Sequence, residues 1–254
     1  MTSTKSINEP TMATTAKDSP SSIEAKGLCH SFGEGDTKVQ VLHGVEFSIR
    51  RGEVIILMGP SGSGKTTVLT LVGCLRSVQE GSVQLLGEEL NGASETTLTQ
   101  MRRRLGFIFQ AHNLHESLTA AQNVGMGLEV HGIRGEAAWR PASERVLELV
   151  GLGERIDFLP EKLSGGQKQR VAVARALVGN PEIIFADEPT AALDKKTSKQ
   201  VVSLLRRLAD ERQTTVLMVT HDHRVLDVAD RILMMEDGRI VEEKSTSESI
   251  EIPQ

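Results

Sequence analysis

Residues 59–66 combine glycines, hydroxyl groups and one lysine at a spacing that suits phosphate binding. The stretch reads Gly-Pro-Ser-Gly-Ser-Gly-Lys-Thr and fits the pattern G-x-x-x-x-G-K-T. Glycines let a backbone wrap closely around an anion and point its N–H groups inward. Lys65 adds a point charge for the β- and γ-phosphates of a nucleoside triphosphate, and the Thr66 hydroxyl is a potential Mg²⁺ ligand. The candidate nucleotide-binding residues here are Gly59, Pro60, Ser61, Gly62, Ser63, Gly64, Lys65, Thr66 and Thr67.

The segments on either side of this loop are of the kind that position it. Residues 54–58 are apolar and rich in β-branched side chains, which indicates a buried strand. Residues 67–72 contain neither proline nor glycine and indicate the start of a helix. A helix that begins at the loop offers unpaired N–H groups and the positive end of its dipole. Strand, loop and helix therefore favour a P-loop over a glycine-rich turn with an incidental lysine.

Polar side chains follow three more apolar, strand-like stretches. These are Asp187 and Glu188 after 183–186, Gln110 after 106–109, and His221 after 215–220. Because ligands of open α/β sheets bind outside the carboxyl ends of the strands, we expect these side chains to lie beside the P-loop.

Each of these side chains has a chemical role to offer. Asp187 is expected to hold Mg²⁺ and Glu188 to polarise the attacking water. Gln110 could bind Mg²⁺ or that water, and His221 could contact a γ-phosphate. Alternatively, the two acids form the N-terminal pair of a helix, and Gln110 and His221 are ordinary loop residues.

A second potential anion site precedes another helix. Residues 163–167 read Leu-Ser-Gly-Gly-Gln, and apolar or small residues then recur with helical spacing up to residue 178. Ser164, Gly165, Gly166 and Gln167 would expose N–H groups at this helix N-terminus. The alternative is a capped helix after a turn.

The segment before the P-loop is strand-like and carries one notable aromatic residue. Residues 23–49 suggest an antiparallel β-piece. Phe32 could stack on an adenine, a contact worth about 1–3 kcal/mol. The alternative is a core residue, and periodicity alone favours this alternative.

The remaining organisation follows from composition. Residues 111–163 lack strand-like runs and suggest a helical insert, and residues 232–241 suggest a hairpin around Asp237 and Gly238. Residues 1–22 and 245–254 are polar and are expected to form disordered tails around a domain of residues 23–244.

Bulk properties narrow the class of protein. The chain has 254 residues and a formal net charge of −5, which argues against nucleic-acid binding through bulk charge. Cys29 and Cys74 form no zinc-like pattern, and we expect both to be small core residues of a reduced, cytosolic protein. No apolar run approaches the roughly 18 residues of a membrane span, so a role at a membrane is expected to need a partner.

Taken together, these motifs resemble those of the ATP-binding-cassette (ABC) ATPases over residues 23–244. The similarity is carried by the Walker A loop at 59–66, the Q-loop Gln110, the signature at 163–167, the Walker B acids Asp187 and Glu188, the D-loop at 192–194 and the switch histidine His221. Phe32 falls at the A-loop position, where the family usually has tyrosine. The resemblance therefore favours Phe32 stacking on adenine.

The family resemblance implies both a fold and an assembly. It implies a RecA-like α/β P-loop NTPase core with an antiparallel β-subdomain and a helical subdomain. It also implies a head-to-tail homodimer that encloses two ATP molecules with Mg²⁺. Each ATP would contact the P-loop of one copy and Ser164 and Gly166 of the other, with Asp194 near the same interface.

Within the family, residues 107–114 and 118–124 are similar to MacB- and LolD-type ATPases, and especially to the DevA type. Such proteins energise FtsX-like permeases, in DevA-like systems for glycolipid export with a membrane-fusion protein. The resemblance implies a peripheral ATPase on the cytoplasmic face of the inner membrane. Lipoprotein release of the LolD type and a soluble, non-transport cassette are the alternatives.

Overall fold

Two sheets organise the protein in the computed structural model, which describes residues 21–191 and 193–246. The first sheet is antiparallel, with the order β2-β1-β4-β5. Its strands are Ser21–Phe32 (β1), Val39–Arg50 (β2), Glu80–Leu85 (β4) and Glu88–Glu89 (β5). It is the antiparallel β-piece that the sequence predicts.

The second sheet has the order β10-β9-β3-β8-β7-β6 and is parallel except for its edge pair β9–β10. Its strands are Val54–Met58 (β3), Leu105–Ile108 (β6), Ile183–Asp187 (β7), Thr215–Val219 (β8), Arg231–Glu236 (β9) and Arg239–Ser245 (β10). Every residue of β3 and β8 is buried, which explains why their sequences are continuously apolar rather than alternating.

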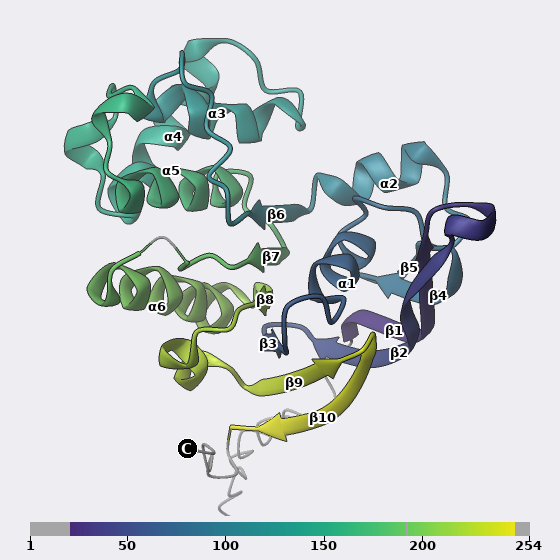
Figure 1. Cartoon of the computed structure of the whole chain (residues 1–254). Coiled ribbons are helices and arrows are strands. Elements are labelled where there is room, and N and C mark those ends of the chain that lie inside the picture. Colours follow the sequence, from purple (N-terminus) through teal and green to yellow (C-terminus); the bar gives the residue numbers. More distant parts are fainter. Residues whose placement is uncertain (1–20, 192, 247–254) are drawn as a thin grey trace, which may run out of the picture.

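Helices cover the second sheet and form a separate lobe (Figure 1). They are Lys65–Val72 (α1), Glu95–Arg102 (α2), Ala120–Glu129 (α3), Glu136–Leu149 (α4), Gly165–Leu177 (α5) and Lys195–Arg212 (α6). Short 3₁₀ helices lie at Gly35–Thr37, Gly153–Arg155, Pro160–Lys162 and His223–Val228. Helices α3, α4 and α5 pack on one another in the lobe at the upper left of Figure 1.

Several helices begin earlier than the sequence suggests. Helix α1 begins at Lys65 and α5 at Gly165, inside the glycine-rich loops. Helix α4 begins at Glu136, well before residues 142–150, which are the part that composition indicates as helical, and Pro141 lies within it. Trp139 fits closely against Gly125 of α3, where a Cβ atom would lie 2.7 Å from the indole ring. This packing stabilises a helical turn that local propensity does not predict.

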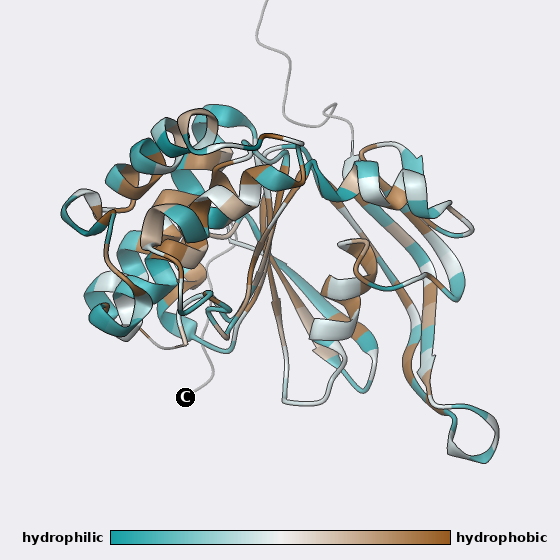
Figure 2. Cartoon of the chain, turned by 90° about the horizontal axis from the view of Figure 1, so that it is seen from above, coloured by the Kyte–Doolittle hydropathy of each residue, from teal (hydrophilic) through white to brown (hydrophobic). Residues whose placement is uncertain are grey.

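Two apolar clusters hold the layers together, and Figure 2 shows hydrophobic segments gathered between the helices and the sheets. One cluster joins the second sheet to α3, α5 and α6. The other fills the space between the two sheets around α1 and includes Phe185 and Leu28. The predicted core position of Cys74 is confirmed, whereas Cys29 is only half-buried because it lies on β1 facing away from this cluster.

The chain termini differ slightly from the predicted boundaries. Residues 1–20 and 247–254 of the predicted tails lie outside the described part of the chain. Ser21 and Ser22 belong to β1, and Ser22 is buried, where it accepts a hydrogen bond from the Thr215 hydroxyl at 2.9 Å. In the described residues, no helix is both long and apolar enough to cross a membrane.

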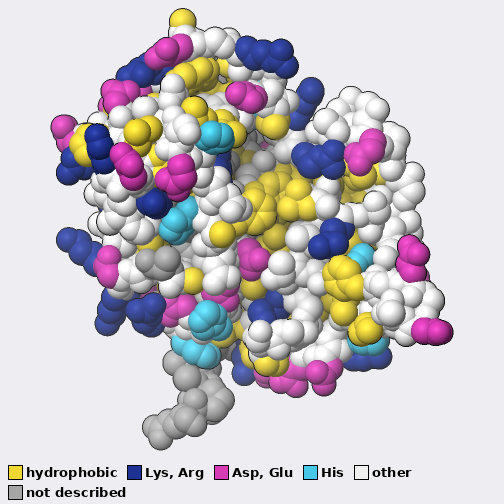
Figure 3. Space-filling model, turned by 45° about the horizontal axis from the view of Figure 1, so that its top comes forward, with side chains coloured by type: hydrophobic (Ala, Val, Ile, Leu, Met, Phe, Trp, Pro, Cys, Tyr) yellow, Lys and Arg dark blue, Asp and Glu magenta, His cyan; other side chains and the backbone are white. Residues whose placement is uncertain are grey.

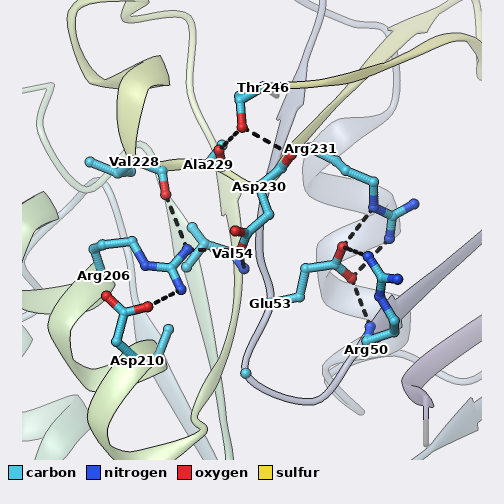
Figure 4. A network of polar contacts seen from close by, with 12 residues as sticks. Arg50, Glu53, Val54, Arg206, Asp210, Val228, Ala229, Asp230, Arg231 and Thr246 are labelled. Carbon is cyan, nitrogen blue, oxygen red and sulfur yellow. Dashed lines mark hydrogen bonds and ion pairs between the residues drawn. The ribbon is translucent and has the colours of Figure 1, made fainter. Parts of the chain in front are cut away.

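A polar network fixes the starts of β3 and β9 (Figure 4). The buried Glu53 carboxylate accepts hydrogen bonds from Arg231 Nε at 2.7 Å and from the Arg50 side chain at 3.0 Å. Asp230 accepts from the backbone N–H of Val54 at 2.8 Å and pairs with Arg206 of α6 at 2.7 Å. These contacts connect both sheets and α6 at the end opposite to the carboxyl ends of the parallel strands.

Candidate functional site

A cavity of about 580 Å³ lies at the carboxyl ends of β3, β7 and β8. It is lined by P-loop residues together with Gln110, Asp187, Glu188 and His221. The structure therefore brings together side chains from four separate stretches of sequence, as the strand-edge argument predicts.

The P-loop conformation depends on its glycines. Gly59 has φ +148°, and a Cβ atom at this position would lie 1.9 Å from the carbonyl oxygen of Met235. Gly64 has φ +99° and is the N-cap residue of α1, where no side chain caps the helix. The N–H groups at the start of α1 are therefore available to an anion in the cavity.

Lys65 folds back over the loop that precedes it. Its Nζ donates to the carbonyl oxygens of Gly59 at 2.9 Å and Pro60 at 2.7 Å. Burial lowers the pKa of the Lys65 ammonium, although the charges of Glu188 and Asp187 oppose this shift. The arrangement places a cation at the mouth of the loop, where phosphate oxygens can accept its hydrogen bonds.

Asp187 and Thr66 lie side by side. The Thr66 hydroxyl donates to Asp187 Oδ2 at 3.2 Å. Burial raises the pKa of Asp187, and the Glu188 charge adds to this effect, while the Thr66 hydrogen bond and Lys65 oppose it. A carboxylate in this environment is favourably placed to bind a cation.

These two oxygen donors fit Mg²⁺, which is usually held by one or two protein groups, substrate phosphates and water. In the described residues, no cluster of three or more His, Cys, Asp or Glu side chains could hold a metal ion. Two protein oxygens would leave the other positions around such an ion to nucleotide phosphates and water. Gln110, the third predicted ligand, lines the same cavity.

Glu188 is held on both carboxylate oxygens. His221 Nδ1 donates to Oε1 at 2.7 Å, and the Thr220 hydroxyl donates to Oε2 at 3.2 Å. The Glu188 side chain is 13% exposed, whereas that of His221 is 75% exposed. His221 thus contacts the candidate base in addition to facing the cavity, a contact that the sequence does not predict.

The predicted nucleotide contacts outside the P-loop do not line this cavity; they are Phe32, Ser164, Gly165, Gly166, Gln167 and Asp194. The Phe32 ring is 37% exposed, so it is not a core residue, and it packs edge-on against His30 with the Arg76 guanidinium 5.0 Å above it. Ser164 and Gln167 form a capping box at the start of α5, with bonds of 3.3 and 2.8 Å. Asp194 caps α6 by accepting from the N–H groups of Lys196 and Thr197. Ala192 of the predicted D-loop lies outside the described residues.

Sequence reasoning missed Val41 and Thr220. Val41 lines the cavity from β2, more than fifteen residues before the P-loop, and Thr220 contacts Glu188 from the end of β8. No local pattern marks Val41. Thr220 could have been found from its position between a buried strand and His221.

Comparisons with known proteins are consistent with this geometry. The model of the ABC transporter family matches residues 42–191. The chain is 42% identical over 229 residues to YknY of Bacillus subtilis (strain 168), an uncharacterized ABC transporter ATP-binding protein, covering 90% of this chain and 99% of YknY. It is 40% identical over 223 residues to the macrolide export ATP-binding/permease protein MacB 1 of Aeromonas hydrophila subsp. hydrophila. That match covers 87% of this chain, which spans only 34% of MacB 1.

A solved structure shares the fold over most of its length. The dimeric structure of a post-hydrolysis state of the ATP-binding cassette MJ0796 bound to ADP and Pi matches with a TM-score of 0.82 and 38% sequence identity. The match covers 88% of this chain and 98% of that cassette. The predicted nucleotide-binding-domain fold is therefore confirmed.

Proposed function

The chain belongs to the ABC transporter family and is an ABC-type ATPase, and we propose that ATP hydrolysis at the cavity of Lys65 and Glu188 drives a membrane permease in export. The observation that carries the proposal is the meeting, in one cavity, of a P-loop, the Thr66–Asp187 pair and the Glu188–His221 pair.

Each group has a role in the proposed hydrolysis. Lys65 and the N–H groups at the start of α1 bind the β- and γ-phosphates. Thr66, Asp187 and Gln110 would hold Mg²⁺, which neutralises charge on the phosphate oxygens when bound. Glu188 accepts a proton from the attacking water. The water oxygen bonds to the γ-phosphorus, and the bond between that phosphorus and the β–γ bridging oxygen breaks. His221 orients the Glu188 carboxylate through Oε1.

The role of Glu188 is tested by Glu188→Gln. The amide keeps the size of the side chain but cannot accept the proton, so hydrolysis should fall by at least about 100-fold. ATP binding should persist, because the P-loop is unchanged, and ATP should accumulate in a dimer that gel filtration detects. Normal turnover in this variant would rule out Glu188 as the base.

We also propose that two copies act together, with α5 of each copy completing the other's site. Gly166 supports this proposal. Among the described residues, a Cβ atom added at Gly166 would meet only Leu193 at 3.5 Å and Thr197 at 3.7 Å, which are ordinary contacts. Packing within one copy therefore does not demand a glycine, although glycine weakens a helix. Close approach of a phosphate bound to a second copy would explain why glycine occupies this position at the helix N-terminus.

The permease is proposed to bind an apolar groove between the helical lobe and α2. The groove is lined by Leu75, Phe107, Phe109, Met126 and Val130, with Arg102, Arg103 and Arg175 among its polar residues. Figure 3 shows hydrophobic side chains in the hollow between the helical lobe and the rest of the molecule. Leu75, Met126 and Val130 are 41%, 37% and 52% exposed, so three large apolar side chains are open to solvent at one groove.

The docking proposal predicts that Val130→Asp abolishes recovery of the chain with membranes and its stimulation by the permease. A charge at this position opposes burial of the groove. Val241→Asp is the matched control, because Val241 is 54% exposed on β10, away from the groove. Basal ATP hydrolysis should be unchanged in both variants. Equal membrane recovery of the two variants would place the contact elsewhere.

The finer assignment rests on resemblance. We propose an FtsX- or MacB-like permease, with or without a membrane-fusion protein, and a DevA-like lipid or glycolipid cargo, with the ATPase at the cytoplasmic face of the inner membrane. MacB 1 joins ATP binding and permease in its name, which supports an export system. Gentle solubilisation of membranes with the tagged chain tests this. A permease of another class would exclude the assignment, and recovery without any membrane partner would favour a soluble cassette. Lipoprotein as the co-purifying cargo would favour the LolD-type alternative.

A further inference from the structure

The end of strand β8 contacts Glu188 at three consecutive residues. The Glu188 N–H donates to the carbonyl oxygen of Val219 at 2.8 Å. The Thr220 hydroxyl and His221 Nδ1 then donate to separate carboxylate oxygens. The adjacency follows from the sheet, because Asp187 of β7 lies in register with Val219 of β8. Backbone and side chain of Glu188 are thus both held by one neighbouring strand end.

The backbone of Glu188 needs such support. Its φ is +48°, a left-handed conformation that is uncommon for residues other than glycine, asparagine and aspartate. Residues in such conformations persist where their surroundings fix them, and they gather at functional sites. The hydrogen bond to Val219 fixes the peptide but leaves the side-chain torsions free. Orientation of the carboxylate therefore depends on Thr220 and His221.

The two side chains that contact the Glu188 carboxylate differ in burial. The His221 side chain is 75% exposed, whereas Thr220 is fully buried. The Thr220 oxygen also accepts the backbone N–H of Asp222 at 3.1 Å. A carboxylate oxygen can only accept, so the single hydroxyl proton of Thr220 is directed to Glu188. Thr220 therefore offers a buried donor with a second hydrogen bond of its own, whereas His221 offers an exposed one.

We propose that Thr220 is a positioning residue for ATP hydrolysis, whose buried hydroxyl holds Glu188 Oε2 so that Oε1 faces the attacking water. The inference rests on the proposed role of Glu188 as the base. The carboxylate keeps its basicity toward water, because each oxygen has a second lone pair beyond the one that accepts a hydrogen bond. Thr220 itself is fully buried and does not line the cavity.

The test compares Thr220→Val with Thr220→Ser in the full-length chain. Valine keeps the shape of the side chain and removes the hydroxyl, so kcat should fall about tenfold or more while KM for ATP stays within about twofold. Serine keeps the hydroxyl and should restore most of kcat. Thr220→Cys gives a further variant if valine does not fold, because a thiol fills the space but donates weakly. Its kcat should lie between those of the serine and valine variants.

Thr215→Val is the matched control. Thr215 is also fully buried and hydrogen-bonded, but it lies at the other end of β8. Its substitution should leave kcat near the wild-type value. If Thr220→Val acted only by loosening the fold, melting temperature and ATP affinity would fall with kcat, and the proposal would be overturned.

Two further results separate this inference from the proposed function. Normal turnover by Glu188→Gln would show that Glu188 is not the base, and the inference about Thr220 would then lose its premise. An inactive Glu188→Gln alongside a Thr220→Val variant of wild-type kcat would overturn the Thr220 inference alone. In a double-mutant cycle, Thr220→Val and His221→Ala should be non-additive, because both act through the same carboxylate. Strict additivity would mean that the two residues act independently.

Discussion

At the scale of single residues, Phe32 combines exposure with fixed neighbours. Its ring lies against His30 and beneath the Arg76 guanidinium. A ring that is held in place and 37% exposed can stack on a base at little entropic cost. Burial of His30 and the Arg76 charge lower the pKa of His30, which favours the neutral form of this imidazole. Adenine stacking therefore stays a prediction with a physical basis.

Phe32→Ala should weaken ATP binding by about 1–3 kcal/mol, the value of one stacking contact. Phe32→Tyr keeps an aromatic face and should bind ATP normally. Titration calorimetry with ATP and with inorganic triphosphate tests whether the lost contact is one to the base. In the alanine variant, the affinity for ATP should fall and the affinity for triphosphate should not. Unchanged ATP affinity in the alanine variant would show that the ring serves the fold and not the nucleotide.

At the scale of elements, the starts of β3 and β9 depend on a charge network centred on the buried Glu53 and the largely buried Arg231. Burial disfavours the Glu53 carboxylate, but hydrogen bonds from Arg231 and Arg50 outweigh this penalty and hold the pKa of Glu53 below its ordinary value. Arg231 also donates to the backbone carbonyl of Ser48 and to Glu243. The network therefore joins β2, β3, β9 and β10, and a paired buried charge fixes their relative positions.

Glu53→Gln should lower the free energy of unfolding by about 1–3 kcal/mol at pH 7, because the amide removes the buried carboxylate that Arg50 and Arg231 share. The pKa of Glu53 is depressed in the folded state. The contribution of the Glu53 carboxylate to the free energy of unfolding is therefore complete above its unfolded pKa near 4.5. This contribution is lost as pH falls through the folded pKa.

The difference between wild type and variant in urea unfolding should accordingly shrink below about pH 4. Glu46→Gln on the exposed side of β2 is the control and should have little effect at any pH. A difference that stays constant down to pH 3 would contradict the assignment to Glu53 ionisation.

At the scale of the whole molecule, the signature loop lies apart from the cavity that holds the P-loop. Ser164 and Gly166 do not line that cavity, and the Ser164 hydroxyl caps its own helix. The start of α5 nevertheless has the N–H groups and dipole of an anion site. A second copy of the chain is the partner that the dimeric MJ0796 cassette suggests.

Mixing two inactive variants tests this assembly. Lys65→Ala disables the P-loop, and Gly166→Asp repels phosphate at α5 while favouring that helix N-terminus. In a mixed dimer, one site receives both changes and the other receives none. Equal mixing should therefore restore about a quarter of wild-type activity, if sites act independently and copies exchange freely.

Each variant alone should remain inactive in the same ATPase assay. Gly153→Asp, in a 3₁₀ turn of the helical lobe, controls for added charge and should be active alone. A mixture no more active than its components would contradict independent sites shared between copies.

The sequence by itself determined the local parts of this protein. The P-loop, the buried strands and the polar residues at strand ends are encoded by residue type and spacing over a few positions, so they could be predicted before any contact was known. Helix boundaries were less certain, as in α4, because Trp139 and Gly125 meet only after folding.

Only the tertiary structure decided which distant residues share a site. Strand order places β8 between β3 and β7, and this order brings Thr220 onto Glu188. Pairing of the antiparallel sheet brings Val41 to the cavity, and folding of the helical lobe keeps Ser164 away from it. Such placements depend on crossovers and on packing between segments far apart in the chain, and no local pattern encodes them.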